Sequence, residues 1–209
     1  MKNQVSYGVN ECPLWRHFRL GDPCALSTIF NENYDSLYYY GKKLIKDDEI
    51  VKDCVQNLFL RMWTSRSKLM AVRDVRPYLL KSLRRLIADH VLASNRKKAL
   101  HIEAPLEFQV TYSHEDFLIA TQTSREQGEA LARTLNNLPT RQREAIFLKF
   151  YEGLDYLKIA EVMVLNVQSV RNLIHQSLRS IKSQMTLNTT PAIHIEARRD
   201  ESASTRFHG

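Results

Sequence analysis

Glycine and proline are scarce in this sequence, which has six of each among 209 residues. Loop-rich β proteins need many of these residues at their turns, so the scarcity argues against that class. Cysteine is scarcer still: Cys12, Cys24 and Cys54 are odd in number and have no Cys-x-x-Cys spacing. We therefore expect reduced thiols, and neither a disulfide framework nor a metal site.

Long apolar runs are also missing. No stretch approaches the roughly 20 apolar residues that span a bilayer, and the N-terminal segment lacks the apolar core of a signal peptide. We therefore expect a cytoplasmic protein. The sequence also lacks a glycine-rich phosphate loop, a recognisable Ser/His/Asp grouping and a metal-ligand spacing. These absences predict that the protein is not an enzyme and uses no catalytic residue, metal, cofactor or small-molecule substrate.

Positive charge is in excess. The chain has 30 Lys and Arg against 23 acidic residues, a net charge of +7, which favours an anionic partner such as nucleic acid. Residues 66–98 contain ten basic and two acidic residues, so this segment alone carries +8. That concentration favours a phosphate-binding strip over an ordinary solvated face. The sign then inverts, since residues 102–138 carry a net charge of −4.

Three helical patterns follow one another closely over residues 138–182. Thr140, Asp155 and Asn166 each stand where an N-cap residue would begin one of these helices. Gly153 can end the first helix, because glycine readily adopts the left-handed conformation found after helix ends. A short helix, a tight turn and an amphipathic helix together are typical of a helix-turn-helix unit.

The first helix of this unit has its apolar positions at Ile146, Phe147 and Phe150, whereas the last helix has a donor-rich polar face. The polar face of the last helix consists of Gln168, Ser169, Arg171, Asn172, His175 and Arg179. Arg, Asn and Gln are the side chains that pair bidentately with purine edges in the major groove of DNA. The alternative is a plain helical hairpin with a solvated polar face, and the three-helix grouping and the rest of the chain favour DNA binding.

Three further helices are expected in the N-terminal half, over residues 24–45, 49–64 and 76–94. The acidic residues 47–49 suit the N-terminus of the second helix. The first helix carries one apolar stripe: Leu26, Phe30, Tyr34, Leu37, Tyr38 and Gly41. The second is expected to bury Val51, Val55, Leu58, Phe59 and Met62 and to expose Asp53, Gln56, Asn57, Leu60 and Arg61. The third is expected to pack through Leu79, Leu83, Leu86 and Ile87, with His90 or Val91.

These patterns predict an all-α protein of two small helical domains joined by a flexible linker. The expected boundaries are an N-terminal arm over 1–20, a three-to-four-helix domain over 21–98 and an acidic linker over 99–123. A helix-turn-helix domain over 124–184 and a disordered tail over 185–209 complete the chain.

The segment from Asp53 to Trp63, DCVQNLFLRMW, resembles a pattern of extracytoplasmic-function (ECF) sigma factors of bacterial RNA polymerase: D-x-x-Q, an acid, then an aromatic residue and a closing Trp. The resemblance covers residues 24–98 (family region 2) and 124–182 (family region 4). It continues in Pro77-Tyr78-Leu79-Leu80 with Asp89, Leu138-Pro139, Arg141-Gln142-Arg143-Glu144, Glu152-Gly153-Leu154, Ile159-Ala160-Glu161 and Val170-Arg171-Asn172-Leu173-Ile174.

The resemblance implies a sigma factor that binds core RNA polymerase and directs promoter-specific initiation. Contacts to the clamp helices of the largest polymerase subunit fall on Asp53, Gln56, Asn57, Phe59 and Leu60, and region 4 would meet the polymerase flap. Contacts of region 2 to double- and single-stranded promoter DNA are expected from Arg66, Lys68, Lys81, Arg84, Arg85, Arg96, Lys97 and Lys98. The upstream element would be read by the polar face after Asn166. An anti-sigma factor is a further expected partner.

Four positions depart from the family pattern. Asn57 replaces an acid, and Arg85 replaces an amide that reads the downstream element. Lys158 stands where an acid would complete a capping box, and Val164 stands where the turn has glycine. A β-branched residue disfavours positive φ, so we expect either a different turn or a less stable domain.

Two alternative functions are compatible with a basic helical chain. One is a helix-turn-helix regulator that acts without polymerase. The other, of a different class, is a basic helical adaptor that binds RNA or anionic lipid without promoter discrimination.

Overall fold

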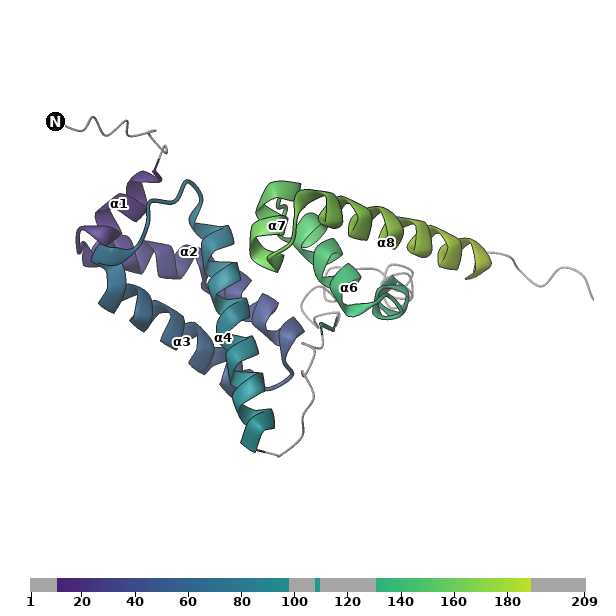
Figure 1. The fold of residues 1–209 in the computed structure, drawn as a ribbon, viewed down its shortest axis with the longest axis horizontal. Helices are drawn as coiled ribbons and strands as arrows, with labels where there is room; N and C mark the ends of the chain where they lie inside the picture. Colours follow the sequence, from purple (N-terminus) through teal and green to yellow (C-terminus); the bar gives the residue numbers. More distant parts are fainter. Residues whose placement is uncertain (1–10, 98–107, 110–130, 189–209) are drawn as a thin grey trace, which may run out of the picture.

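The computed structural model describes residues 11–97, 108–109 and 131–188, and these fold into helices with no strand among them. Helices α1 to α4 form an N-terminal bundle, and α6 to α8 form a C-terminal bundle that packs against it (Figure 1). The predicted all-α class with two helical domains is confirmed.

The N-terminal bundle is built on α2 (Pro23–Leu44), α3 (Asp48–Ser65) and α4 (Val75–Lys97). Asp47 begins α3 as expected, because its carboxylate accepts from the backbone N–H groups of Glu49 and Ile50. Gly41 lets α2 approach α3 closely, since a Cβ there would lie 2.6 Å from Cγ1 of Val51. The predicted core residues Val51, Val55, Leu58, Phe59 and Met62 of α3 are all buried.

The segment predicted as an N-terminal arm contains a helix, α1 (Pro13–Arg19). Trp15 and Phe18 on α1 are fully buried, and the Trp15 indole donates to the Met70 carbonyl at 2.9 Å. The arm prediction is therefore wrong for these seven residues, whereas residues 1–10 lie outside the described part. Seven residues make only two turns, too few for a helical period to show in the sequence.

The C-terminal bundle contains α6 (Thr140–Ile146), a π-helical turn η2 (Phe147–Tyr151), α7 (Tyr156–Met163) and α8 (Val167–Asn188). A further helical segment covers residues 131–136. Asp155 and Asn166 cap α7 and α8 as predicted, accepting from the N–H groups of Lys158 and Ser169 at 2.9 and 2.7 Å. Thr140 is not the cap of α6: Pro139 holds that position, and no side chain caps the helix.

The π-helical turn corrects the prediction for Phe150. In this turn the N–H of Glu152 donates to the carbonyl of Phe147, five residues earlier. The wider turn shifts the helical register, so Ile146 and Phe147 are buried as expected whereas Phe150 is 61% exposed.

Val164 adopts the left-handed conformation, with φ 54° and ψ 51°, at the turn between α7 and α8. The N–H of Leu165 donates to the carbonyl of Ala160, which is the six-to-one bond of a Schellman cap. The turn therefore has the geometry that glycine would provide, and the valine side chain is exposed.

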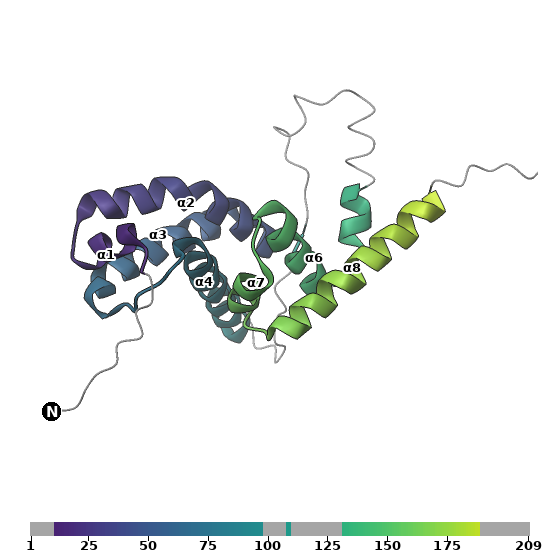
Figure 2. The ribbon, with the colours of Figure 1, turned by 90° about the horizontal axis from the view of Figure 1, so that it is seen from above.

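The two bundles are in direct contact. Helix α4 packs against α7 (Figures 1 and 2), and Phe108 is buried between Tyr40 and Phe147, with ring centroids 6.2 and 5.4 Å away. The N–H of Gln109 donates to the carbonyl of Lys43 at 2.8 Å. These two described residues of the predicted linker are thus packed, and the rest of residues 99–123 lies outside the described part. Helix α8 runs four residues past the predicted domain end at 184, and residues 189–209 are not described.

The burial of α1 gives a test of its role in the core. Trp15→Ala should lower the free energy of unfolding by about 3–5 kcal/mol, because it removes a fully buried indole. Leu20→Ala, one residue past the same helix and 82% exposed, should change it by less than about 0.5 kcal/mol. Urea denaturation followed by circular dichroism measures both. Equal, small effects would show that α1 is not part of the core.

The strained turn gives a second test. Val164→Gly should raise the free energy of unfolding by about 1 kcal/mol, since it removes a left-handed penalty of about 1–2 kcal/mol and adds a smaller entropy cost. Val164→Ala should give a smaller gain, because alanine keeps most of the penalty. Thermal unfolding of the three proteins measures the order, and a glycine variant less stable than the wild type would contradict it.

Candidate functional site

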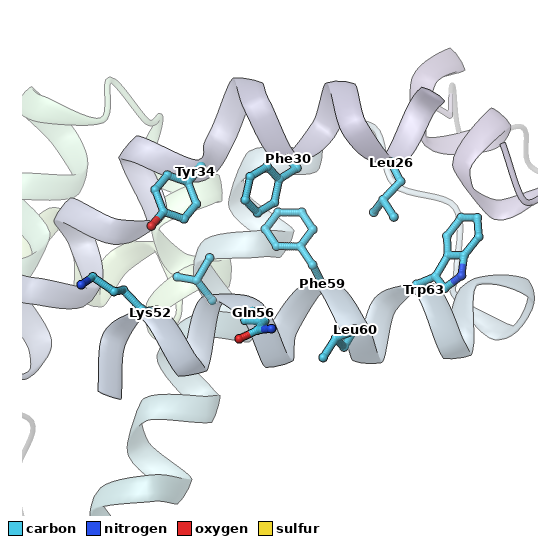
Figure 3. Close-up of a pocket in the computed structure, with 9 residues that line it drawn as sticks. Leu26, Phe30, Tyr34, Lys52, Gln56, Phe59, Leu60 and Trp63 are labelled. Atoms are coloured by element: carbon cyan, nitrogen blue, oxygen red, sulfur yellow. The ribbon is translucent and has the colours of Figure 1, made fainter. Parts of the chain in front are cut away.

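An apolar groove of about 470 Å³ runs between α2 and α3 (Figure 3). Leu26, Phe30 and Tyr34 line it from α2, opposite Phe59 and other residues of α3. Phe30 and Phe59 meet edge to face, with ring centroids 4.9 Å apart. The remaining lining residues are Lys52, Val55, Gln56, Leu60 and Trp63.

The groove exists because α2 carries two apolar faces. One faces the core through Ala25, Ile29, Leu37, Tyr40 and Leu44, which are buried. The other presents Leu26, Phe30 and Tyr34 to the groove. The sequence predicted a single apolar stripe on this helix, but only Leu37 and Gly41 of that stripe are buried. The predicted stripe therefore mixes residues that face the core with residues that line the groove. The sequence signal for the groove was that α2 carries more apolar residues than one core-facing side can hold.

Three of the five residues expected to contact the polymerase line this groove: Gln56, Phe59 and Leu60. Leu60 is 57% exposed and lies at the edge of the apolar groove. Asp53 and Asn57 are exposed on the same helix but do not line the groove. The lining residues of α2, together with Lys52 and Trp63, were missed from the sequence.

The residues expected to bind DNA from the first domain fall into four groups. Lys68, Lys81 and Arg85 are exposed. Arg66 instead stacks on Trp63, 4.4 Å from the ring centroid, and donates to the Trp63 carbonyl at 2.7 Å. For Arg96 and Lys97 only the helical backbone is described, and Lys98 lies outside the described residues.

Arg84 forms the fourth group, because it faces the other bundle. Its Nε donates to Oε1 of Glu144 at 2.8 Å and its Nη2 to Oε2 at 3.4 Å. The Tyr40 hydroxyl donates to the same Oε1 at 2.7 Å. Glu144 is almost completely buried, with 2% of its side chain exposed. The sequence indicated no role for Tyr40 or Glu144, since the partners are over 100 residues apart.

The environment of this cluster shifts the pKa of its members. Burial, together with the neighbouring Glu144 carboxylate, raises the pKa of Tyr40 well above its ordinary value, so the hydroxyl remains a donor. Burial alone would lower the pKa of Arg84, but the hydrogen bond and charge of Glu144 raise it overall. The guanidinium is thus fixed in its charged form beside the carboxylate.

A second set of contacts lies near the start of α4. Glu152 accepts from the Ser36 hydroxyl at 2.7 Å and pairs with Nε of Arg76 at 3.5 Å. Burial raises the pKa of Glu152, and the Ser36 hydrogen bond and Arg76 partly offset this. Lys158 pairs with Asp74 at 2.6 Å, and that bond raises the lysine pKa. The lysine that departs from the family pattern therefore joins the two bundles.

The polar face of α8 is open. Gln168, Arg171, Asn172, His175 and Arg179 are exposed, and Ser169 is half-buried. The Gln168 amide donates to Oδ1 of Asn172 at 3.0 Å, and the Arg171 guanidinium lies 5.8 Å from the centre of the Tyr156 ring. Figures 1 and 2 show α8 extending away from the N-terminal bundle, so that bundle leaves the helix accessible to a long ligand.

Comparison with known families matches both halves of the chain. The Sigma-70 region 2 family matches residues 29–97, and the Sigma-70, region 4 family matches residues 128–181, together more than half of the chain. The chain therefore belongs to the sigma-70 family. It is a sigma factor of the ECF type that directs transcription initiation. The regulator without polymerase and the RNA- or lipid-binding adaptor are not favoured.

Similar proteins agree with this assignment. The ECF RNA polymerase sigma factor SigK of Mycobacterium sp. (strain JLS) is 20% identical over 166 residues, which are 78% of this chain and 83% of SigK. The fold also resembles CnrH in complex with the cytosolic domain of CnrY (TM-score 0.58, 18% identity, covering 84% of this chain and 97% of CnrH). It resembles RpoE of Bartonella quintana, in complex with the anti-sigma factor NepR (0.55, 15%, 78% and 97%).

Two further findings bear on the site. No helix in the described part of the chain is long and apolar enough to cross a membrane. Within the same residues, no group of three or more His, Cys, Asp or Glu side chains could hold a metal ion.

Proposed function

We propose that this sigma factor binds core RNA polymerase through the groove between α2 and α3. The observation that carries the proposal is the exposed apolar lining of that groove, in which Phe30 is 36% and Leu60 57% exposed. An apolar groove with polar residues on its rim fits one face of an amphipathic helix. Gln56 and Asp53 would then supply the polar contacts that fix the register of the polymerase helix.

Helix α8 would read the upstream promoter element in the major groove. Its N-terminus is fixed by the Asn166 cap, and the donor-rich side chains Gln168, Arg171 and Asn172 follow within the first two turns. In helix-turn-helix proteins these N-terminal positions of the second helix contact base edges.

The downstream element would be bound by the basic strip of α4 and the loop before it. Lys68, Lys81 and Arg85 are exposed there and can contact phosphates, while Arg84 becomes available only if its pair with Glu144 breaks. The roles of Arg96, Lys97 and Lys98 rest on the charge pattern of the sequence. No step in this function requires catalytic chemistry from the chain. The chain would act in the cytoplasm, beside the polymerase.

An anti-sigma factor is the further partner we propose. CnrH and RpoE, which share this fold, were each captured with a partner protein, and NepR is described as an anti-sigma factor. A protein that covers the α2–α3 groove would exclude the polymerase by occupying the same apolar surface.

The polymerase-binding surface is tested by Leu60→Ala. We expect about a tenfold loss of affinity for core polymerase, because the truncation removes an exposed apolar contact at the groove. The unfolding free energy should change by less than about 0.5 kcal/mol.

The matched control is Leu92→Ala, at a leucine of α4 that is 39% exposed and does not line the groove. Fluorescence anisotropy with labelled chain measures the affinity, and equal affinities of the two variants would contradict the assignment. Failure of the wild type to form a complex and initiate transcripts would contradict the function itself.

The reading helix is tested by Arg171→Ala. If Arg171 contacts a base, the variant should lose about 1–3 kcal/mol of promoter binding, with a loss that depends on the base at one position. Lys81→Ala should weaken binding evenly across promoters and reduce the salt slope by about one. Transcription by the reconstituted holoenzyme on a set of promoter mutants measures the difference. Identical profiles for the two variants would contradict the division between base reading and phosphate binding.

A further inference from the structure

Helix α1 is the part of the N-terminal bundle that the proposed function leaves unexplained. It lies outside the residues that either family matches, and none of its residues lines the α2–α3 groove. Its Trp15 is nevertheless fully buried, so the helix has a fixed place in the structure. Besides α2, the helix contacts the α3–α4 loop (residues 66–74), which begins with the 3₁₀ turn η1 (Arg66–Lys68).

Two hydrogen bonds hold the backbone of the α3–α4 loop against α1, and the two segments lie side by side in Figures 1 and 2. The backbone N–H of Cys12, at the start of α1, donates to the Val72 carbonyl at 2.9 Å. The indole N–H of Trp15 donates to the Met70 carbonyl, also at 2.9 Å. The two acceptors are two residues apart, so α1 fixes the course of the loop between them.

The Trp15 indole is itself held from several sides. Its ring meets Tyr78 of α4 edge to face and Phe18 at a tilt, with centroids 5.0 and 5.1 Å away. Because the indole is fully buried, its N–H has no access to water and depends on the Met70 carbonyl. The position of the Met70 backbone is therefore set by a group that is fixed in the core.

The loop presents an apolar side chain between two cations. Met70 is 84% exposed, and Lys68 and Arg73, before and after it in the sequence, are exposed as well. Single-stranded nucleic acid suits such a surface, because cations contact its phosphates and apolar side chains contact its unstacked bases. A fixed backbone with an exposed side chain also reduces the entropy that is lost on binding.

We infer that α1 positions the α3–α4 loop for promoter opening: through the Trp15–Met70 hydrogen bond it holds Met70 where this side chain contacts an unstacked base of the downstream element. The inference rests on the proposed function, which assigns the downstream element to α4 and this loop. Trp15 is a positioning residue, since it reaches the DNA only through the backbone of Met70. A contact made only with an unstacked base favours the opened promoter over the duplex.

Met70→Ala tests the contact itself, with a promoter from which the wild-type holoenzyme initiates. We expect about a tenfold loss of transcripts from the duplex promoter, the size of effect that contact with one base provides. On the same promoter with a pre-opened bubble of mismatched bases, opening no longer limits initiation, so the loss should be less than about twofold. The control is Leu20→Ala, at an equally exposed leucine just past α1, which should behave like the wild type on both templates.

Trp15→Phe tests the positioning role, because phenylalanine keeps an aromatic ring but has no N–H to donate to Met70. It should show the same selective loss on the duplex. Combined with Met70→Ala, it should lose no more than Met70→Ala alone, since both act through one contact. Ile29→Val, at a fully buried residue of α2, is the control for lowered stability and should affect both templates equally.

Cys12→Pro is a second variant of α1 that leaves Trp15 intact. Cys12 has φ −55° and ψ 125°, which proline also adopts, so the substitution removes the N–H that donates to Val72 without changing the backbone path. We expect the same selective loss on the duplex. The inference is overturned if Met70→Ala initiates normally from the duplex. It is also overturned if the α1 variants lose activity equally on both templates, as Ile29→Val does.

A separate measurement distinguishes this failure from failure of the proposed function. All of these variants should bind core polymerase like the wild type, because none of the substituted residues lines the groove. Normal use of the duplex by the loop and α1 variants overturns only the positioning role. Failure of the wild type to bind core polymerase, or to initiate from either template, overturns the proposed function.

Discussion

The buried cluster of Arg84, Glu144 and Tyr40 is the interaction on which the arrangement of the two bundles depends. It brings a charged pair into a site where only 2% of the Glu144 side chain is exposed. A buried carboxylate is tolerated only when donors surround it, and here three hydrogen bonds meet its two oxygens. Removing any donor leaves a buried charge incompletely paired, so the packing of the two bundles depends on all three hydrogen bonds.

Separate surfaces of one small chain can serve separate partners because each helix divides its faces. Helix α2 faces the core on one side and the groove on the other, and α4 faces the core on one side and the C-terminal bundle on the other. Helix α8 buries Val170 and Ile174 and leaves its polar face to solvent. The groove is thus exposed, whereas Arg84 on α4 is paired with Glu144 of the C-terminal bundle.

Much of this architecture follows from the sequence. Hydrophobic periodicity predicted α2, α3, α4 and α8 to within a few residues, and the caps Asp47, Asp155 and Asn166 were correct because capping is a local interaction. Contacts between residues far apart in the chain were not predictable. Glu144 belongs to a family motif, but nothing near it in sequence indicates that its partner is Arg84, 60 residues away. The two apolar faces of α2 were predicted as one stripe for the same reason, because the sequence does not show which residues of other helices each face contacts.

The central claim is that core polymerase binds in the groove between α2 and α3. It is tested most directly by placing a photo-crosslinking residue at position 60, on the edge of the groove, and another at position 92, which does not line it. The account predicts a crosslink to core polymerase from position 60 and none from position 92. Equal crosslinking from the two positions would contradict it.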